Sequence, residues 1–524
     1  MISTELAVLL LCLPLIAAVA GWAAERIGVP YPLLLVSAGA LLSLLPWSRV
    51  PQLSPQLVFF VFLPPLIYYA AYFIAPEDLR ANVGQIGLLA VGLVLITMGA
   101  VAAVLVGVGG VPLGVAAVAG AVVAPTDPVA ATTVFRRLNV PERLVTIVEG
   151  EGLINDGTAL VLYVGAVAAT VATTLHPGQL AVMLLAAPLG GAVLGLAIAW
   201  VLVALRRRID QPLVEITLSL ATPYLTYVPA QAAGLSGILA TVAAGVYVGS
   251  RSGSIYAPGA RLQAFAFLDV LVFLLNSVLF TLVGMQLVRV LHRVPGIPTE
   301  MVVAMSAAVV AAVVGVRMAW MLFEPAAARP LRCLGKSLER RERVVVGWVG
   351  MRGGVSLAAA LAVPRQLADG SPFPDRELVI VIAAAVVVVT LLAQGMTLPW
   401  LLHKLRIGRK DSGSQERIAR LQAVRAALAW LDDHIDAGCA DNAVASVRSL
   451  YEARHRRLAV ARGDRAESFG GAAEPERYLE LRLEMLSVER SVVLGLRQQG
   501  RISATVHRGL ERSLDLEEAR LRGS

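Results

Sequence analysis

The sequence predicts an all-α polytopic membrane protein that ends in a water-soluble helical tail. Of its 524 residues, 57% are hydrophobic and 16% are charged, a balance that water-soluble globular proteins of this length do not reach. Apolar stretches of about 20 residues, long enough to cross a bilayer as helices, recur up to residue 403. Beyond it, Arg, Glu, Ala and Leu follow a helical period. We therefore expect a transmembrane domain over residues 1–403 and a cytoplasmic helical tail over residues 404–524.

Charged residues and Pro/Gly-rich breaks divide the apolar part into about 13 transmembrane helices. The first stretch carries Glu5 where a signal peptide would be basic, so we interpret it as a retained helix. The expected helices cover residues 5–24, 31–48, 53–74, 84–109, 112–135, 144–174, 178–205, 212–229, 234–249, 264–288, 299–323, 344–364 and 378–402.

An odd number of helices places the two termini on opposite sides of the membrane. If the N-terminus is outside, the loops on the cytoplasmic side contain more Lys and Arg than the loops on the outer side. This bias favours a cytoplasmic C-terminus. We expect a multi-pass protein of the inner (plasma) membrane of a bacterium. The net charge of +8 is explained by these helix ends, so the expected partner is the lipid bilayer and not nucleic acid. Cys12, Cys333 and Cys439 have no metal-ligand spacing, and no cofactor is expected.

The 13 helices divide into six, a connector and six, so that the second six begin on the opposite side of the membrane. Such an inverted repeat is typical of secondary transporters. The fifth helix of each half is interrupted, by APTDP at residues 124–128 and by GMRGG at residues 350–354. Pro and Gly are also common in ordinary membrane helices, but a charge at both breaks favours a transport site. Unwound backbone at this depth must line a cavity.

The sixth helix places four polar residues, Glu149, Glu151, Asn155 and Asp156, in an apolar span. A carboxylate at such depth costs about 3 kcal/mol on insertion scales and needs water or a partner. Glu149 is near the helix end, where an interfacial charge is the simpler interpretation. Because desolvation disfavours the charged form of a carboxyl group, Asp156 is expected to hold a proton until a cation replaces it.

The interrupted fifth helix can complete a cation site around Asp156. Hard cations prefer carboxylate, carbonyl and hydroxyl oxygens, and this break offers the Thr126 hydroxyl, freed carbonyls and Asp127. Asn155 is neutral, which leaves one titrating carboxylate beside it and favours electroneutral exchange of one cation for one proton. The sequence therefore predicts a transporter, and not an enzyme, that exchanges Na⁺, or K⁺ or Li⁺, for H⁺.

Two arginines lie in predicted membrane helices of the second half. Arg352, in the GMRGG break, is permanently charged and needs an anionic partner. We expect Glu151 to be that partner, in a structural ion pair that leaves Asp156 free. Arg317 lies about a turn and a half from the inner end of its helix, where snorkelling to the interface explains it.

These motifs resemble those of sodium/proton antiporters of the NhaP and eukaryotic exchanger type, the monovalent cation:proton antiporter-1 family. The strings that carry the resemblance are FFVFLPPLIYYAAYF, APTDPVA, GEGLINDG, LSGILA and GMRGGVSLAAAL, and it covers the chain to about residue 403. It implies a homodimer with a dimerisation domain and a mobile core in which two discontinuous helices cross, working by elevator-type alternating access. It further implies a cation site at Asp156, Thr126 and Asp127, a Glu151–Arg352 pair, and Asn155 as the mark of the electroneutral branch.

The chain departs from the family pattern at two positions. Relatives have GES where this chain has GEG, so the hydroxyl that helps to bind the ion is replaced by Gly152. Relatives also have Glu where this chain has Gln231, in PAQAAGLSG. The first departure bears on ion selectivity, and the second bears on the response to pH.

Three alternatives stay open at this point. The same motifs permit potassium/proton exchange. Asp127 and Asp156 could form the acid dyad of an intramembrane aspartyl protease, although no GxGD string occurs. A channel is the third alternative, but a titrating acid between mirrored broken helices suits a carrier better than an open pore.

The tail carries two clear helical patterns. From Gln415 to Asp436, apolar residues recur every three or four positions, which predicts an amphipathic helix. A last helix is expected from about Ser503 to Arg522. We interpret the tail as a small helical bundle for assembly or docking, with regulation as the alternative.

Overall fold

The structure, a computed structural model, describes residues 4–27, 29–44, 55–74, 76–138, 140–171, 186–209, 211–255, 258–291, 297–327, 338–367, 370–407, 412–434, 442–459 and 475–522. Within these ranges every regular element is a helix, so the all-α class is confirmed. Residues 45–54 and 172–185, which carry parts of predicted helices, lie outside the described residues.

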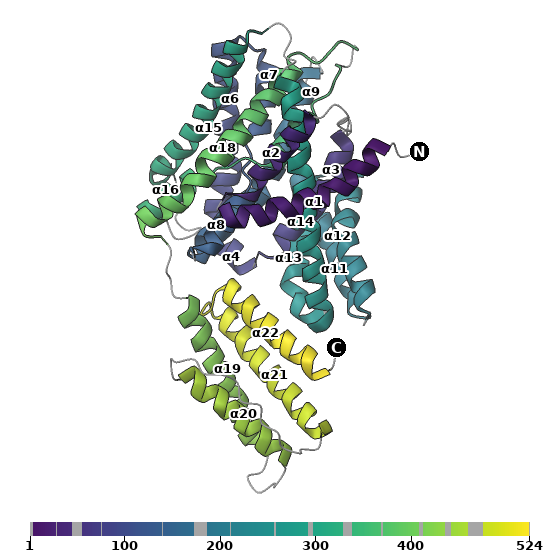
Figure 1. Ribbon diagram of the computed structural model, residues 1–524, viewed down its shortest axis with the longest axis vertical. Helices are drawn as coiled ribbons and strands as arrows, with labels where there is room; N and C mark the ends of the chain where they lie inside the picture. Colours follow the sequence, from purple (N-terminus) through teal and green to yellow (C-terminus); the bar gives the residue numbers. More distant parts are fainter. Residues whose placement is uncertain are drawn as a thin grey trace. The chain divides into compact units, whose positions relative to one another are not determined.

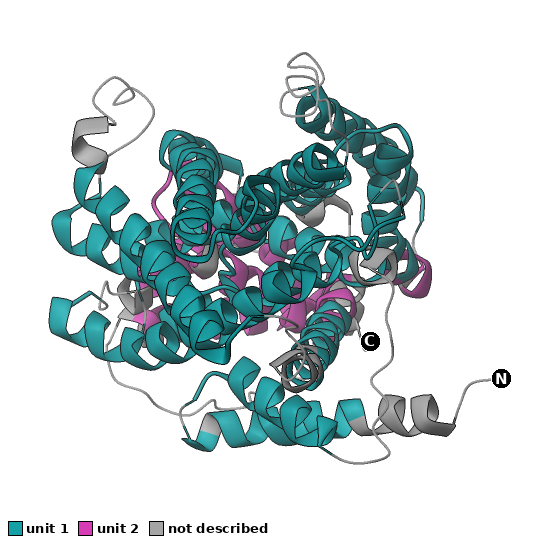
Figure 2. Cartoon of the chain, turned by 90° about the horizontal axis from the view of Figure 1, so that it is seen from above, with its two compact units in different colours: residues 1–209, 217–255, 266–408 teal, residues 210–216, 256–265, 409–524 magenta. Residues whose placement is uncertain are grey.

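The chain forms two compact units, coloured separately in Figure 2. The first contains residues Met1–Ile209, Thr217–Ile255 and Ala266–Gly408. The second contains Asp210–Ile216, Tyr256–Phe265 and the tail from Arg409 to Ser524.

Six helices of the described residues are long and apolar enough to cross a membrane. Shorter apolar helices accompany them, among them α2 (Tyr31–Ser43), so the total of 13 spans and the inverted repeat remain predictions. The six long segments are Val83–Gly109, Glu142–Val171, Ala187–Arg206, Arg261–Leu282, Thr299–Phe323 and Arg376–Leu405.

Helix α18 (Arg376–Leu405) lies at the centre of the first unit. Its first half buries side chains on every face, among them Val381 and Val386, whereas its second half has an exposed stripe that includes Met396 and Trp400. A helix segment that is apolar on every face packs in the interior. Helices α7 (Leu113–Val123), α15 (Thr299–Ala327), α16 (Arg340–Trp348) and α17 (Gly354–Leu361) contact it. Figure 1 shows α15 running beside it.

Both predicted interruptions are present. Helix α7 ends at Val123, residues 125–128 form no regular element, and α8 (Val129–Arg137) begins after them. Proline cannot donate to the preceding turn, which explains why the helix stops here. In the second half, α16 ends at Trp348 and α17 begins at Gly354.

The two interruptions lie against each other. The backbone N–H of Asp127 donates to the carbonyl oxygen of Met351 over 2.8 Å, which joins the first break directly to the second. Helix α9 (Glu142–Val171), which carries the polar residues of the sixth predicted span, packs against α7 and α8 and contacts α16 and α17. The fold therefore brings the two breaks and the acidic helix together.

Helices α2 and α14 (Pro258–Leu291) cross at reciprocal glycines. A Cβ atom on Gly39 would lie 2.0 Å from the carbonyl oxygen of Thr281, and one on Gly284 would lie 2.0 Å from that of Val36. Only glycine permits backbones to approach this closely in a membrane-type helix pair.

The tail forms a four-helix bundle of α19 (Ser412–His434), α20 (Asn442–Ala459), α21 (Pro475–Gln498) and α22 (Ala504–Arg522). The two predicted tail helices are thereby confirmed. Small residues of α19, such as Ala423 and Ala427, face the bundle core with Val424 and Leu431, whereas Ile418 is 49% exposed.

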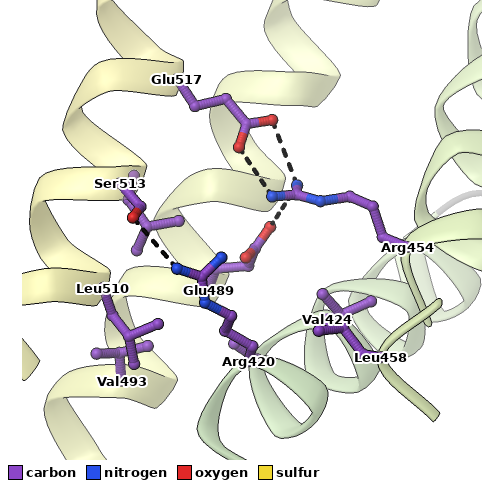
Figure 3. Close-up of a pocket in the computed structure, with 11 residues that line it drawn as sticks. Arg420, Val424, Arg454, Leu458, Glu489, Val493, Leu510, Ser513 and Glu517 are labelled. Atoms are coloured by element: carbon purple, nitrogen blue, oxygen red, sulfur yellow. Dashed lines mark hydrogen bonds and ion pairs between the residues drawn. The ribbon is translucent and has the colours of Figure 1, made fainter. Parts of the chain in front are cut away.

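Charged side chains line a cavity of about 260 Å³ inside this bundle (Figure 3). Arg454 contacts Glu517 over 2.9 Å and Glu489 over 3.4 Å, and Arg420 donates to Ser513 over 3.4 Å. Arg420 also contacts Glu416 over 2.7 Å. Both arginines are therefore paired with carboxylates, and the rest of the lining is mainly apolar.

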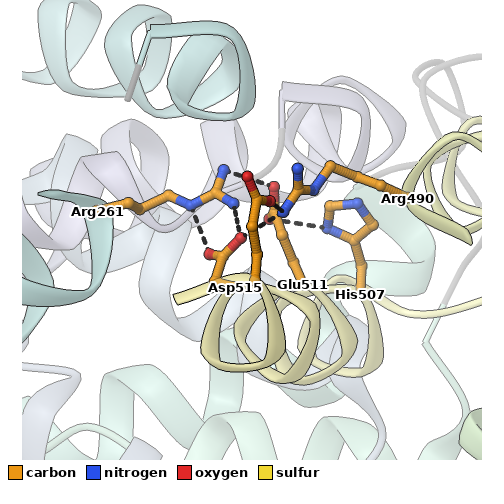
Figure 4. A network of polar contacts seen from close by, with 6 residues as sticks. Arg261, Arg490, His507, Glu511 and Asp515 are labelled. Carbon is orange, nitrogen blue, oxygen red and sulfur yellow. Dashed lines mark hydrogen bonds and ion pairs between the residues drawn. The ribbon is translucent and has the colours of Figure 1, made fainter. Parts of the chain in front are cut away.

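A second polar network in the same unit centres on Asp515 of α22 (Figure 4). Arg261 donates to Asp515 through both Nε, over 2.8 Å, and Nη2, and it contacts Glu511 over 2.8 Å. Arg490 contacts Asp515 over 2.9 Å. Arg261 is 2% exposed, so a desolvated positive charge is neutralised by α22.

Candidate functional site

A chain of hydrogen bonds links the first break to α9. The Thr126 hydroxyl donates to Oε1 of Glu151 over 3.1 Å and accepts from Nδ2 of Asn155 over 2.8 Å. Glu151 and Asn155 are four residues apart, so they share a face of α9 and can both reach the same hydroxyl. The structure thus brings these three predicted residues together.

The predicted partner of Glu151 is wrong. Arg317 of α15, and not Arg352, pairs with Glu151: Nη1 lies 2.5 Å from Oε1 and Nη2 lies 2.8 Å from Oε2. Both side chains are 1% exposed. Arg317 therefore does not snorkel to the interface. Its planar guanidinium matches the carboxylate with two parallel bonds, which compensates the loss of water better than a single contact would.

Arg352 instead binds the end of the first half-helix. Its Nε donates to the carbonyl oxygen of Val123 over 3.0 Å and its Nη2 to that of Ala124 over 3.4 Å, while Nη1 donates to Gly350. The last carbonyls of a helix have no partner within it and carry partial negative charge. Arg352 satisfies those of α7, which explains how it is tolerated without the predicted Glu151 pair.

Asp127 occupies the opposite kind of helix end. Its Oδ1 accepts the backbone N–H of Val129 over 2.8 Å, at the start of α8. Its Oδ2 would lie 1.7 Å from a Cβ on Gly353, the residue that precedes α17, so only glycine fits there. A carboxylate at two helix N-termini is stabilised by their partial positive charge.

Asp156 differs from its charged neighbours. Within the described residues its carboxylate has no hydrogen bond or ion pair, whereas Glu151 accepts three hydrogen bonds. Its side chain is partly exposed. The buried Oδ1 of Asn155 next to it also has no partner in the described part of the chain. These two oxygen groups are therefore available to a cation or a proton.

Gly152 is packed against the first break. A Cβ at this position would lie 2.6 Å from Cδ of Pro128 and 3.3 Å from the carbonyl oxygen of Thr126. Helix α9 therefore approaches the proline ring closely at Gly152, the position at which the motif resemblance leads us to expect a serine.

We expect Gly152→Ala to destabilise the protein by about 1–3 kcal/mol, because the added methyl group must displace a rigid ring. The melting temperature in detergent and the exchange rate should both fall. Gly99→Ala on α6 (Val94–Gly109) is the matched control, since a Cβ there meets nothing within 4 Å. A Gly152→Ser variant with an unchanged melting temperature would contradict this packing.

Sequence reasoning missed the contacts that Arg317 and Thr390 make with site residues, and it did not single out the buried Gln394. For Arg317, the only sequence signal is its short distance from the helix end, and this distance favours an interfacial position. Thr390 of α18 accepts the Arg352 backbone N–H over 3.1 Å. Gln394, one turn later, is 1% exposed, and neither its amide oxygen nor its nitrogen has a partner among the described residues. The sequence signal for these two residues was that Thr390 and Gln394 are polar and lie four positions apart, on one face of an apolar helix.

No group of three or more His, Cys, Asp or Glu side chains in the described residues is placed to hold a resident metal ion. The oxygen atoms that Thr126 and Asn155 place at the first break are instead neutral.

Comparison with known proteins identifies the family of the chain. The family model described as "Sodium/hydrogen exchanger, transmembrane" matches residues 15–404. An uncharacterised Na⁺/H⁺ exchanger of Mycobacterium tuberculosis is 35% identical over 508 residues, which cover 95% of this chain and 93% of the relative. The Na⁺/H⁺ antiporter ApNhaP of Aphanothece halophytica is 32% identical over 420 residues, covering 78% of this chain and 76% of the relative.

A solved structure shares the fold. The sodium proton antiporter MjNhaP1 of Methanocaldococcus jannaschii superposes with a TM-score of 0.60 at 18% identity, covering 77% of this chain and 99% of that chain. The relatives are exchangers and not hydrolases, which excludes the protease alternative. The chain belongs to the transmembrane sodium/hydrogen exchanger family.

Proposed function

We propose that this protein exchanges one Na⁺ for one H⁺ at Asp156, electroneutrally and by alternating access. The observation that carries the proposal is the division of charges around the breaks. Glu151 is bonded to Arg317, Asp127 lies at helix N-termini and Arg352 binds helix C-terminal carbonyls, whereas Asp156 has no partner in the described residues. One carboxylate is therefore left for the transported ions.

The Asp156 carboxylate would bind the cation together with oxygen atoms of Thr126 and Asn155. All are hard ligands of the kind that Na⁺ prefers. Asp127 adds negative charge at the break, although its Oδ1 is engaged by Val129. Because Gly152 supplies no hydroxyl, a backbone carbonyl or water completes the cage.

A single carboxylate explains the coupling. Cation and proton cannot occupy the same carboxylate oxygens together, so binding of one releases the other. Asn155 adds no charge, and Arg317 already neutralises Glu151. The site then carries the same charge with Na⁺ as with H⁺, and a membrane potential exerts no net force on the loaded protein.

We further propose a homodimer in the cell membrane, with the N-terminus outside and the C-terminus in the cytoplasm. The loop charges and the motif resemblance support this arrangement. Mass measurement of the purified protein in detergent tests the dimer, and protease access to tagged termini in sealed vesicles tests the orientation.

The exchange itself is tested in proteoliposomes with an imposed proton gradient. Adding Na⁺ should dissipate the gradient, and parallel additions of K⁺ and Li⁺ rank the cations, including the K⁺ alternative. In a Na⁺ assay, a potential set by K⁺ and valinomycin should leave the rate unchanged. A gradient that no cation dissipates contradicts exchange, and a rate that follows the potential contradicts electroneutrality.

A further inference from the structure

The first residues of α14 belong to the same compact unit as the tail. Residues Tyr256–Phe265 are part of the second unit, whereas the helix from Ala266 onward is part of the first. Helix α14 continues through this boundary without a break, and its apolar segment Arg261–Leu282 is long enough to cross a membrane. A restraint on the start of α14 is therefore also a restraint on a helix of the transmembrane unit.

Arg261 is the residue through which α22 holds the start of α14. Its Nε donates to Oδ2 of Asp515 over 2.8 Å, and its Nη1 contacts Oε1 of Glu511 over 2.8 Å (Figure 4). Arg261 and Asp515 are both 2% exposed. Because a buried ion pair has given up its water, it depends on the remaining contacts, and a change of charge beside it is costly. We call the contacts of Arg261 with Glu511 and Asp515 the Arg261 clamp.

A histidine lies beside the Arg261 clamp. His507 is one turn before Glu511 on α22, and its Nδ1 lies 3.8 Å from Oε2 of that carboxylate. The ring is mostly buried. Histidine is the side chain whose charge ordinarily changes near neutral pH, so a proton on His507 adds a cation where Arg261 already occupies the carboxylate.

The surroundings of His507 disfavour its protonated form. Four charged groups from α14, α21 and α22 act on the ring: Glu511, Arg497, Arg508 and Arg261. Burial has the largest effect and lowers the pKa of His507; the carboxylate opposes this shift, and the three arginines reinforce it. A released histidine has a pKa of about 6.5. The closed arrangement is therefore fully favourable above that pH and weakens as the pH falls below it.

We propose that α22 holds the start of α14 through the Arg261 clamp, and that protonation of His507 opens the clamp when the side of the membrane that carries the tail becomes acidic. The protonated ring competes with Arg261 for Glu511 and adds a positive charge beside the arginines. Alternating access requires helices of the transmembrane unit to move, so a held α14 slows the cycle and a released α14 speeds it. This inference rests on the proposed exchange function and adds a response to acid that is separate from Asp156.

The first test follows the clamp without transport. Hydrogen–deuterium exchange of the full-length protein in detergent, corrected for the intrinsic effect of pH, measures the protection of backbone amides in α22. From neutral pH (about 7.5) to acid pH (about 5.5), this protection should fall roughly three- to tenfold in wild type. His507→Gln, which takes up no proton, should keep its protection at acid pH. His507→Lys, which is always charged, should have lost it at neutral pH.

His434→Gln is the matched control, because His434 is an exposed histidine of α19 in the same bundle. It should respond to acid as wild type does. Burial also raises the pKa of the Asp515 carboxyl, so Asp515 is the competing acid-sensitive group. If His507→Gln loses protection at acid pH as wild type does, the inference about His507 is overturned.

The clamp itself is tested by Arg261→Gln. This variant should lose protection of α22 already at neutral pH, while α19 stays protected as part of the bundle. If Arg261→Gln keeps the wild-type protection of α22, Arg261 does not hold this helix and the inference is wrong.

The second test asks whether the clamp limits exchange. Uptake of radioactive Na⁺ into proteoliposomes is measured with the same pH on both sides, and wild type is compared with His507→Gln, so that the pH dependence of Asp156 cancels. The two rates should agree at neutral pH, whereas at acid pH wild type should be roughly two- to fivefold faster. Equal rates at acid pH overturn the effect of the clamp on exchange.

The two proposals fail in different ways. The protection of α22 is measured without transport, so Asp156→Asn should keep the acid response of the tail although exchange is lost. If Asp156→Asn keeps exchanging ions, the proposed function is wrong whatever the result at His507. If wild type exchanges Na⁺ and Asp156→Asn does not, while His507→Gln matches wild type in both tests, only the inference about the clamp is wrong.

Discussion

Replacing Asp156 by Asn should reduce cation-dependent proton exchange to the level of protein-free liposomes. Asn has nearly the same shape but can neither take up a proton nor neutralise a cation. Since the Asp156 carboxylate has no partner in the described residues, its removal breaks no internal contact, and the melting temperature should be unchanged or higher. Lost transport with intact folding is the expected signature.

The measurement is Na⁺-driven recovery of internal pH in proteoliposomes of equal protein content. Asp375→Asn controls for the loss of one negative charge and should behave as wild type. Asp156→Glu keeps the titrating group and should retain part of the rate. Full exchange by Asp156→Asn would refute the assignment of the exchange site.

Removing Arg317 should have the largest effect on stability. In Arg317→Met the buried Glu151 carboxylate loses its two closest donors, and breaking a buried pair in this way costs about 3–5 kcal/mol. We expect a large drop in melting temperature and a poor yield from the membrane. Arg317→Lys should recover part of the loss, because it restores the charge but not the two parallel bonds.

A double variant tests the pairing itself. Glu151→Gln removes the charge that Arg317→Met leaves unpaired, so the double variant should be more stable than Arg317→Met alone. Glu151→Gln should not rescue Arg352→Met, since Arg352 donates to carbonyl groups of Val123, Ala124 and Gly350. If Glu151→Gln instead rescued Arg352→Met and not Arg317→Met, Glu151 would pair with Arg352, as the sequence predicts.

The breaks could be predicted because their causes are local. Pro125 and Pro128 favour a break because proline cannot donate a backbone hydrogen bond within a helix, and the glycines around Arg352 also disfavour a continuous helix. The shared face of Glu151 and Asn155 follows from their spacing alone. Each of these features needs only the geometry of a single helix.

The ion pair could not be predicted in the same way. Glu151 and Arg317 are separated by 166 residues, and the choice between two arginines depends on how α15 is rotated against α9. The sequence predicts an anionic partner for Arg352 because it does not show that the terminal carbonyls of α7 lie beside this arginine. Helix-end carbonyls are strong acceptors that a search for acidic residues overlooks.

The tail shows the same limit. The apolar period predicted a helix from Gln415, three residues after α19 begins, and it also misjudged the buried face, since Ile418 is exposed while Ala419 and Ala423 are buried. Close helix packing selects small side chains, and hydrophobicity alone does not reveal which residues face a neighbour. The role of Gly152 likewise depends on the place of Pro128, which lies 24 positions earlier in the sequence.

The central claim is that Na⁺ and H⁺ compete for Asp156, and proton release measures this competition without transport. Na⁺ is added to the purified protein in weakly buffered detergent solution, and the pH is followed. Wild type should release about one proton per protomer as the cation displaces it, and Asp156→Asn should release none. Equal proton release from the two proteins would contradict the claim.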